Sequence, residues 1–478
     1  MIRIMIVGGG IAGLSAAYYA KKRLPDSRIM VIESNSYWGG KIATERIASD
    51  AGQFIIEGGP DSFLASKPWG IALCEELGLG ERLHGTNPKQ KNTYILHKGC
   101  LLPLPDGLAM MIPTNIRSIL GSRLLSWLGK ARMGLDLFLP AKADHEDESL
   151  GGFVSRRLGR EAYENLIEPL MSGIYAGDGN RLSLASAFPS LRSLELRYGS
   201  LVRGAMGMRK QSHGKALQGS RSAFHTPTTG LAEIVEKLVE CLSSNGVVLR
   251  LNTRAISIEP PTTNTWRVTL DPAEVLETDY IILAAPAYAS GSLVASFDAG
   301  LSSVLQSIPY VSTATVSLAY RLRDIPRGLD GYGYVIPRRE GRRALACTWT
   351  STKFSHRAPE GYALLRVFLG RAGQDVPWDE DELLKLAMEE LNQTLHVTAE
   401  PIISRLFLWD KAMPQYNLGH EDKLKQIDIA LEKYPGLTLA GNGYRGIGIP
   451  DCIRSGEEAA ERALAFTRAK AEALQLLN

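Results

Sequence analysis

The sequence predicts an α/β protein with three parts: a Rossmann-like dinucleotide-binding part, an antiparallel-sheet part and a helical part. Three observations lead to this prediction. A strand–glycine loop–helix pattern opens the chain, and the same pattern returns near its end. Between them, residues 310–370 contain several strands with alternating apolar and polar side chains.

The opening pattern has the spacing of a phosphate-binding turn. Met1–Val7 is a short apolar strand, Gly8–Gly13 reads G-x-G-x-x-G, and the next seven residues suit a helix. Gly8 allows a tight turn, Gly10 lets the backbone approach a pyrophosphate, and Gly13 lets the helix pack on the strand. The phosphates would then lie at the positive N-terminus of the helix.

A second strand, Arg28–Ile32, ends in Glu33, twenty residues past Gly13. A carboxylate at this distance accepts hydrogen bonds from the hydroxyls of a bound ribose. A plain turn before a helix would not need this acid. The pattern therefore predicts that the chain binds an adenine dinucleotide.

Length and charge exclude several classes of protein. The chain has 478 residues, enough for two or three domains, and its 45% hydrophobic and 22% charged residues are ordinary for a soluble protein. The net charge of +3 argues against nucleic acid as a partner. No apolar run reaches about eighteen residues, so we expect no transmembrane helix, and the apolar start fits a strand better than a signal peptide.

The five cysteines are scattered and lack C-x-x-C spacing. An odd number without a framework indicates reduced thiols, and we expect a cytoplasmic protein. The eight histidines show no metal-ligand spacing, and no Ser–His–Asp set or H-E-x-x-H motif occurs. We therefore expect no metal and assign no catalytic side chain.

Two more glycine turns follow the second strand. Gly39-Gly40-Lys41 would place flexible backbone and a positive charge beside the dinucleotide, although a plain turn would read the same. Strands expected at 42–49 and 53–57 lead into the sharp turn Gly58–Ser62, which can bring amide groups close to a ligand.

The segment before residue 225 is expected to be mostly helical. Helices are predicted over 68–87, 114–139 and 150–160. The apolar face of 114–139 fits the core of a helical domain, and a membrane surface is the alternative. Residues 197–225 form a basic, glycine-rich stretch, read either as a solvated loop or as a lid that attracts a polycarboxylate substrate.

The second half of the chain alternates strands and helices. The expected strands lie at 247–251, 255–258, 279–286, 313–320, 344–350, 363–369, 401–409 and 436–440. The expected helices lie at 231–242, 380–395 and 453–470. The glycine loop before the last helix suits negative charge, because the amides of Gly448 and Ile449 lie at the positive end of the helix dipole.

These motifs resemble the amine oxidase superfamily of flavoproteins. Gly8–Gly13, Glu33, Gly39–Lys41 and the Gly59–Ser62 turn look like its FAD-binding half. Three further elements, at 168–178, 409–416 and 446–451, are similar to its bacterial porphyrinogen oxidases. The resemblance implies FAD, a choice over NAD that the glycine fingerprint alone leaves open. The cofactor-binding residues that it implies are Gly8, Gly9, Gly10, Ile11, Ala12, Gly13, Glu33, Ser34, Gly40, Lys41, Gly59, Pro60, Asp61, Ser62, Ala255, Trp409, Gly448, Ile449 and Pro450.

The resemblance also implies a domain organisation. An FAD-binding domain is expected from three segments, 1–66, 226–295 and 435–478. The helical domain is expected at 67–225, on the substrate or membrane side, and the antiparallel-sheet substrate domain at 296–434.

The implied activity is the six-electron oxidation of a porphyrinogen to a porphyrin in haem biosynthesis, with O2 as acceptor and H2O2 as by-product. Coproporphyrinogen III is the expected substrate; protoporphyrinogen IX, an amine, or flavin binding without turnover are the alternatives. Lys67 is a candidate anchor for a substrate carboxylate, and Ile174 and Tyr175 are candidates for an apolar wall against a flat ligand. We expect a monomer or homodimer, at most peripheral membrane contact, and a hand-over of product to the next haem-pathway enzyme.

Overall fold

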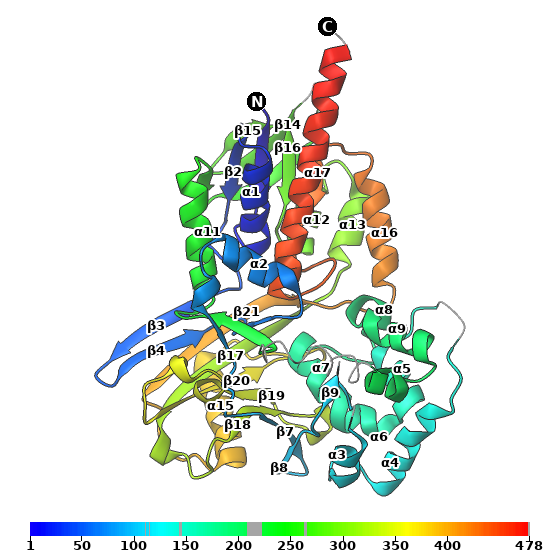
Figure 1. Ribbon diagram of the computed structural model, residues 1–478. Coiled ribbons are helices and arrows are strands. Elements are labelled where there is room, and N and C mark those ends of the chain that lie inside the picture. Colours follow the sequence, from blue (N-terminus) through cyan, green and yellow to red (C-terminus); the bar gives the residue numbers. More distant parts are fainter. Residues whose placement is uncertain (110, 114, 143–145, 208–221, 262–264, 477–478) are drawn as a thin grey trace.

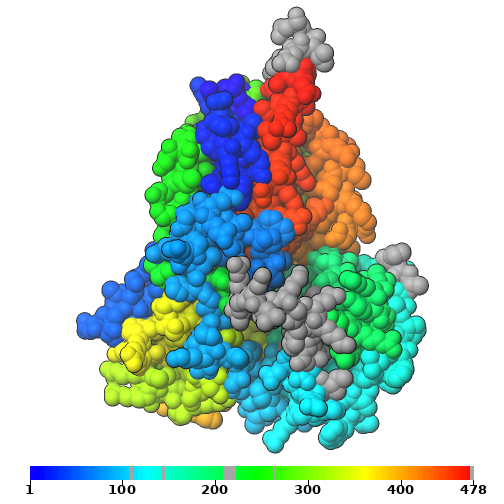
Figure 2. All heavy atoms as spheres, in the orientation of Figure 1, coloured from blue at the N-terminus to red at the C-terminus, as the bar shows by residue number. Residues whose placement is uncertain are grey.

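The computed structural model describes residues 1–109, 111–113, 115–142, 146–207, 222–261 and 265–476. Figure 1 shows a parallel sheet with its helices at the top, and below it an antiparallel sheet beside a group of short helices. In the space-filling view, the upper part carries both the beginning and the end of the chain (Figure 2). The predicted α/β class with its additional antiparallel sheet is confirmed.

Five parallel strands form the sheet that holds the opening pattern. Their order is β12-β2-β1-β16-β22, with β1 in the middle. The strands are β1 (Arg3–Val7), β2 (Arg28–Ile32), β12 (Val248–Arg250), β16 (Tyr280–Leu283) and β22 (Leu437–Leu439). Both faces of the sheet are covered, which explains why β16 is apolar along its whole length. Strands from the start, middle and end of the chain therefore lie side by side.

One face of this sheet packs against α1, α2, α11 and α17, and the other packs against a small sheet and three further helices (Figure 1). Gly456 brings α17 very close to α1, since a Cβ there would lie 2.3 Å from the carbonyl oxygen of Ala12. The helices are α1 (Ile11–Arg23), α2 (Pro68–Glu76), α11 (Ala232–Ser244), α12 (Ala287–Val294), α13 (Ala299–Gln306), α16 (His420–Leu431) and α17 (Ile449–Leu476). The small sheet contains β13 (Arg254–Glu259), β14 (Trp266–Asp271) and β15 (Glu274–Thr278).

The second large sheet has seven strands in the order β21-β17-β20-β19-β18-β7-β8, all antiparallel except for the pair β18 and β7. They are β7 (Asn92–His97), β8 (Cys100–Pro103), β17 (Tyr310–Arg321), β18 (Gly331–Val335), β19 (Ala344–Trp349), β20 (Tyr362–Leu369) and β21 (Ile403–Pro414). Helix α15 (Glu380–Leu395) shares an apolar core with this sheet. The hairpin of β3 (Thr44–Ser49) and β4 (Gly52–Glu57) packs on it through Phe54 and Ile56, and so places the turn after β4 over the sheet.

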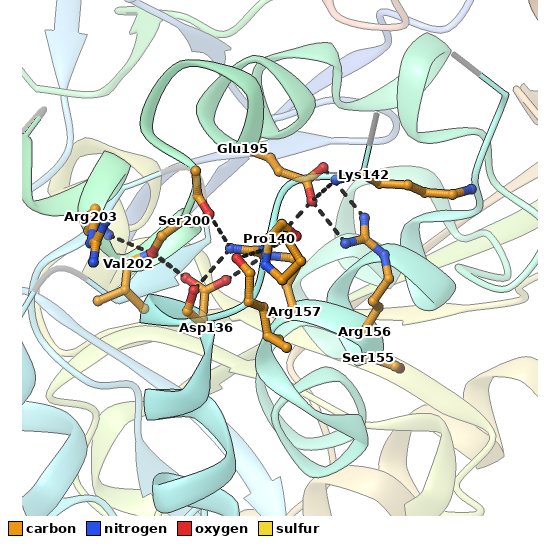
Figure 3. Close-up of polar contacts among 12 residues, drawn as sticks. Asp136, Pro140, Lys142, Ser155, Arg156, Arg157, Glu195, Ser200, Val202 and Arg203 are labelled. Atoms are coloured by element: carbon orange, nitrogen blue, oxygen red, sulfur yellow. Dashed lines mark hydrogen bonds and ion pairs between the residues drawn. The ribbon is translucent and has the colours of Figure 1, made fainter. Parts of the chain in front are cut away.

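Short helices around an apolar core form the third part. They are α3 (Ile116–Gly121), α4 (Trp127–Gly134), α5 (Leu150–Leu158), α6 (Arg160–Ala162), α7 (Glu168–Tyr175), α8 (Leu184–Ala187) and α9 (Pro189–Tyr198). Buried charges also hold this part together (Figure 3). Arg157 Nε lies 2.6 Å from Asp136 Oδ1, and Arg157 Nη1 lies 3.6 Å from Glu195 Oε1, with all three side chains fully buried.

Several expected elements differ from the structure. Helix α2 ends at Glu76, and the predicted helix over 68–87 is wrong because Leu83–Gly85 forms strand β6, which pairs with β11 (Phe224–Pro227). The expected helical region 114–139 is divided, because the Ser126 hydroxyl accepts the Gly129 amide and starts a new helix, α4.

Strand β21 and helix α17 are longer than expected. Strand β21 continues past Trp409 to Pro414, and α17 begins at Ile449.

In the basic stretch 197–225, residues 201–207 are helical, whereas 208–221 lie outside the described residues. No helix in the described parts of the chain combines the length and apolar character needed to cross a membrane.

Candidate functional site

The turn between β1 and α1 has the geometry that the fingerprint requires. Gly8 has a φ of +114°, and a Cβ there would lie 2.8 Å from the carbonyl oxygen of Ala284. A Cβ at Gly13 would lie 1.9 Å from the carbonyl oxygen of Gly8, which is the close helix–strand approach of the third glycine. A Cβ at Gly10 would meet nothing within 4 Å. The turn is therefore open at the position where a pyrophosphate would approach.

Glu33 lies beside this turn and is buried. Its carboxylate accepts the Gly9 amide at 2.7 Å and the Ser34 hydroxyl at 3.2 Å. Its carbonyl oxygen accepts the amide of Thr253 at 2.8 Å, two residues before Ala255. The structure thus brings the glycine turn, the acid and the Ala255 segment together, as expected of an adenosine site.

The second glycine loop packs on the first. The Gly39 amide donates to the carbonyl of Gly9 at 2.8 Å, and a Cβ at Gly40 would lie 3.3 Å from the Cα of Gly10. Burial of the Lys41 ammonium lowers its pKa to about 8. A partly buried cation beside two glycine turns suits an anionic ligand.

The turn after β4 lies against Trp409. The indole Nε1 of Trp409 donates to the carbonyl of Gly58 at 2.9 Å. A Cβ at Gly59 would lie 1.9 Å from the carbonyl oxygen of Lys41 and 3.7 Å from the Trp409 ring. The third and second glycine turns are therefore in direct contact, and Trp409 packs on the third turn.

Pro60, Asp61 and Ser62 continue this turn. Lys353 Nζ lies 2.9 Å from Asp61 Oδ2, and the Ser62 hydroxyl donates to Asp61 Oδ1 at 2.6 Å. Burial alone would raise the pKa of Asp61, but the charges of Lys353 and Arg366 outweigh it and hold that pKa well below its usual value. Asp61 is therefore an ionised and neutralised carboxylate.

The first turn of α17 meets Lys67. Lys67 Nζ lies 2.6 Å from each carboxylate oxygen of Asp451, and Asp451 Oδ2 also accepts the Gly448 amide at 3.2 Å. The predicted carboxylate anchor thus already has a carboxylate partner in this chain. The amide of Gly448 is bonded within its own loop, and Ile449 and Pro450 are the first residues of the helix.

The predicted apolar wall lies beside the same loop. Tyr175 is buried at the end of α7, with its ring centroid 6.1 Å from that of Tyr416, whose hydroxyl donates to the carbonyl of Asn442 at 2.6 Å. Burial and then the charge of Asp451 raise the pKa of Tyr175. Ile174 is about half exposed. Helix α7 is therefore close to the glycine loop that precedes α17.

The sequence reasoning missed the side chains that hold the turn after β4. They are Thr315, Lys353, Arg357 and Arg366. It also missed Asp451, which pairs with Lys67 at the start of α17. Of these residues, only Arg366 is recognisable in the sequence. It interrupts the apolar strand 363–369, and a charged side chain in a buried strand needs partners.

These features define a class of protein. The open glycine turn, the buried Glu33, and the Gly58–Ser62 turn under Trp409 could hold a flavin dinucleotide. The arrangement is that of a flavin-dependent oxidoreductase. Residues 11–464 match the family described as flavin containing amine oxidoreductase, and the chain belongs to that family. The predicted cofactor, FAD, is thereby confirmed.

Relatives extend over the whole chain. A coproporphyrinogen III oxidase of Bacillus subtilis (strain 168) is 36% identical over 97% of this chain and 98% of its own. A protoporphyrinogen oxidase of Bos taurus is 30% identical over 96% of this chain and 98% of its own. A crystal structure from Exiguobacterium sp. 255-15, provisionally assigned as a protoporphyrinogen oxidase, has a TM-score of 0.84 and 33% identity over 97% of this chain and 99% of that one. The predicted resemblance to porphyrinogen oxidases of this superfamily is confirmed.

Proposed function

We propose that this protein oxidises a porphyrinogen to a porphyrin, with coproporphyrinogen III as its substrate. Full-length similarity to coproporphyrinogen III oxidases supports the proposal. The structural observation that carries it is the position of α7. Tyr175 packs on Tyr416, which is bonded to the loop before α17, the adjacent Ile174 is half exposed, and Lys67 adds a cation at the first turn of α17. An apolar wall with a cation nearby suits a flat macrocycle that carries carboxylates.

The chemistry asks little of individual side chains. A bound flavin would accept two electrons and a proton as hydride. Three such rounds remove six electrons and six protons from the porphyrinogen, and three O2 molecules take them up as three H2O2. The chain contributes the open turn at Gly10, the cation at Lys41 and the rigid turn under Trp409, which bind and orient the reactants.

Turnover of the purified, flavin-loaded protein in air tests the proposal directly. Porphyrin fluorescence is followed with coproporphyrinogen III and protoporphyrinogen IX side by side, and we expect faster conversion of coproporphyrinogen. Preference for protoporphyrinogen would overturn the substrate. Oxidation of neither, with release of aldehyde from benzylamine or a polyamine, would favour the amine oxidase alternative. Flavin binding without turnover of any of them would leave a non-enzymatic flavoprotein.

A pair of glycine variants ties turnover to the cofactor turn. Gly10→Val would place a side chain in the open space where the pyrophosphate approaches, and we expect loss of flavin and of porphyrin formation. Gly121→Val is the control, because a Cβ at Gly121 also meets nothing within 4 Å but lies in the helical part. Equal flavin content in both variants would contradict this placement of the cofactor.

We propose that Lys67 contacts a carboxylate of the substrate while it remains paired with Asp451. Loss of a charged hydrogen bond costs about 1.5–3 kcal/mol, so Lys67→Met should raise the KM for coproporphyrinogen III about tenfold or more with a smaller change in kcat. Lys22→Met removes a comparable lysine–carboxylate pair on the surface of α1 and should leave KM unchanged. An unchanged KM for Lys67→Met would remove Lys67 from the substrate site.

We also propose a peripheral contact with anionic membranes through an apolar patch on α3, α4 and the turn after them. The patch consists of Leu120, Trp127, Leu128, Leu135 and Phe138. Trp127, Leu128 and Phe138 are 74%, 84% and 80% exposed. Residues 111–142 carry five cations and a single acid, Asp136, which is buried in its pair with Arg157, so the surface is basic.

Vesicle sedimentation tests the patch. The protein should sediment with phosphatidylglycerol vesicles at low salt, and Trp127→Ser with Leu128→Ser should abolish this binding. Trp378→Ser is the control, because Trp378 is also exposed but follows β20 in the antiparallel-sheet part. Equal sedimentation of the patch variant and wild type would exclude the contact.

The remaining partners are part of the same proposal. O2 is the proposed electron acceptor, and the protein is proposed to act in the cytoplasm, as a monomer or homodimer, and to hand its porphyrin to the next haem-pathway enzyme. Stoichiometric H2O2 release, at one per two electrons removed, would support O2 as acceptor.

A further inference from the structure

Three strands of the antiparallel sheet donate hydrogen bonds to the turn after β4. Thr315 on β17 donates its hydroxyl to the carbonyl of Gly58 at 2.7 Å, and Trp409 on β21 donates to the same oxygen. Arg366 on β20 donates from Nη1 to the carbonyl of Glu57 at 3.1 Å and from Nη2 to the carbonyl of Gly59 at 2.6 Å. Three successive carbonyls of the turn therefore point towards the sheet.

Close packing fixes the turn on both sides. A Cβ at Gly58 would lie 2.4 Å from the Phe407 ring, and a Cβ at Gly59 would lie 1.9 Å from the carbonyl oxygen of Lys41. The Gly58 amide donates to the carbonyl of Ala43 at 2.7 Å. Because backbone lies against an aromatic ring on one side and backbone on the other, the turn has little freedom to tilt.

The Gly59 amide points away from the contacts of the Gly58 carbonyl, because the C=O and N–H of a planar trans peptide lie on opposite sides. Two more backbone amides follow in this turn, at Asp61 and Ser62. Those of Gly59, Asp61 and Ser62 form no hydrogen bond to any part of the chain that the structure describes. Free amides held in a fixed orientation stabilise negative charge on a ligand, because they need no reorganisation when the charge develops. The turn thus offers such an amide edge in the region of Trp409.

Positive side chains outnumber negative ones next to the turn after β4. We call Glu57, Asp61, Lys353, Arg357 and Arg366 the turn cluster. Arg357 Nη1 lies 2.9 Å from Glu57 Oε1, and Lys353 pairs with Asp61, so each carboxylate has its own cation. Arg366 forms no ion pair with the described residues and donates to backbone carbonyls instead. The cluster therefore carries one positive charge in excess.

We propose that Arg366 is a positioning residue for the flavin, which aims the amide edge of the Gly59–Ser62 turn at the cofactor and raises its midpoint potential. Its guanidinium fixes two carbonyls of the turn, and its unmatched charge adds positive potential under the site, so both effects stabilise the reduced, negatively charged flavin. The proposal requires flavin binding but holds whatever the substrate is.

The midpoint potential of the flavin in the loaded protein tests the proposal, measured by absorbance against a reference dye. Arg366→Met should lower it by at least about 30 mV, which is a tenfold shift in a two-electron equilibrium. Arg366→Lys keeps the charge without the fork of two donors and should recover part of the difference.

Arg371→Met is the matched control. Arg371 lies two residues beyond the end of the same strand, is equally buried, and donates to the carbonyls of Ile336 and Arg342, away from the turn. Its removal should leave the potential unchanged. An equal shift in both variants would show that any buried arginine of this sheet matters, and would overturn the proposal.

A second variant covers the case in which Arg366→Met does not retain flavin. Thr315→Val removes only the hydroxyl contact to the Gly58 carbonyl and should shift the potential in the same direction by a smaller amount. An unchanged potential in flavin-loaded Arg366→Met, or in Thr315→Val when the first variant is empty, would overturn the positioning role. Porphyrinogen turnover can fail independently of this result, because the potential is measured without substrate.

Discussion

Two clusters of buried charge hold different parts of this molecule, and they are built from the same groups. The helical cluster consists of Asp136, Arg156, Arg157, Arg192 and Glu195. Figure 3 labels all of these except Arg192. The turn cluster lies against the turn after β4. In both, a buried guanidinium donates to backbone carbonyls: Arg157 to those of Asp136, Leu139, Pro140 and Gly199, and Arg366 to those of Glu57 and Gly59.

The two arginines differ in their partners and in whether backbone amides beside them remain without a hydrogen bond. Arg157 also pairs with Asp136 and Glu195, and all its partners belong to the helical part, so the cluster closes on itself. Arg366 lies on a strand of the antiparallel sheet and holds a turn from the beginning of the chain, while the amides beyond that turn stay open. The same interaction therefore stabilises a fold in one place and presents a binding edge in the other.

The largest effect is expected from removing the centre of the helical cluster. Arg157→Met leaves Asp136 and Glu195 buried beside fewer cations, and loss of a buried partner costs about 3–5 kcal/mol of unfolding free energy. Urea unfolding measures it. The flavin potential of the folded fraction should not change, because the cluster does not touch the turn.

A surface variant provides the control. Arg160→Ala breaks an exposed ion pair with Glu164 one helical turn away and should not change the urea midpoint. If Arg157→Met lowered the flavin potential as much as Arg366→Met, the separation between the two clusters would be wrong.

The next largest effect is the loss of unfolding free energy at low pH that comes from Glu195. Burial would raise the pKa of Glu195, but Arg156 and Arg192 lower it below its usual value. The unfolded chain then binds its proton first as the pH falls, so the contribution of Glu195 is present above about pH 4.3 and is lost below it. Glu195→Gln should cost about 2 kcal/mol at pH 7, and its gap to the wild type should narrow in urea unfolding near pH 3.5.

Glu57 in the turn cluster should show the opposite sign. Burial raises its pKa more than Arg357 lowers it, so the native state binds the proton first and stability falls as the pH rises through about 4.3 towards that raised pKa. The unfolding free energy of the wild type minus that of Glu57→Gln should therefore be larger at low pH than at neutral pH. Parallel pH profiles for the Glu195 and Glu57 variants would contradict the contrast.

The smallest effect is expected at Lys41, which lies between the glycine turns and outside both clusters. Its pKa is lowered to about 8 by burial, so above that pH its charge is lost and the flavin potential should fall more steeply with pH. Lys41→Met should remove this break and lower the potential below pH 8 by about 30 mV, equivalent to ~1.4 kcal/mol for two electrons. A potential titration between pH 6 and 9.5 measures both, and a break that persists in Lys41→Met would assign it to another group.

Local patterns predicted much of the nucleotide end of the site. The Gly8–Gly13 turn and Glu33 belong to one short stretch in which backbone geometry and chain spacing dictate the residue types. The parallel sheet followed for the same reason, since each of its strands is a brief apolar run that ends in a turn. Such signals survive in a single sequence because no distant partner is needed to interpret them.

The flavin end was harder to predict, because its contacts join residues far apart in the chain. Lys67 meets Asp451 across 384 positions, and Arg366 reaches the Gly59 carbonyl across 307. The sequence predicts a helix at Leu83–Gly85, because only the pairing with β11 makes this segment extended. Helical periodicity describes one element at a time and carries no information about such pairings.

The position of β22 and α17 has a consequence for synthesis. Strand β22 forms the edge of the parallel sheet beside β16, and Gly456 of α17 packs on α1, so the sheet and the cover of the opening helix stay incomplete until residues 437–476 have been translated. At ribosomal rates of about 5–20 residues per second, the glycine turn waits roughly 20 to 90 s for them. We therefore expect cofactor loading to be late and largely post-translational, and a chain truncated before β22 should be released from the ribosome without flavin.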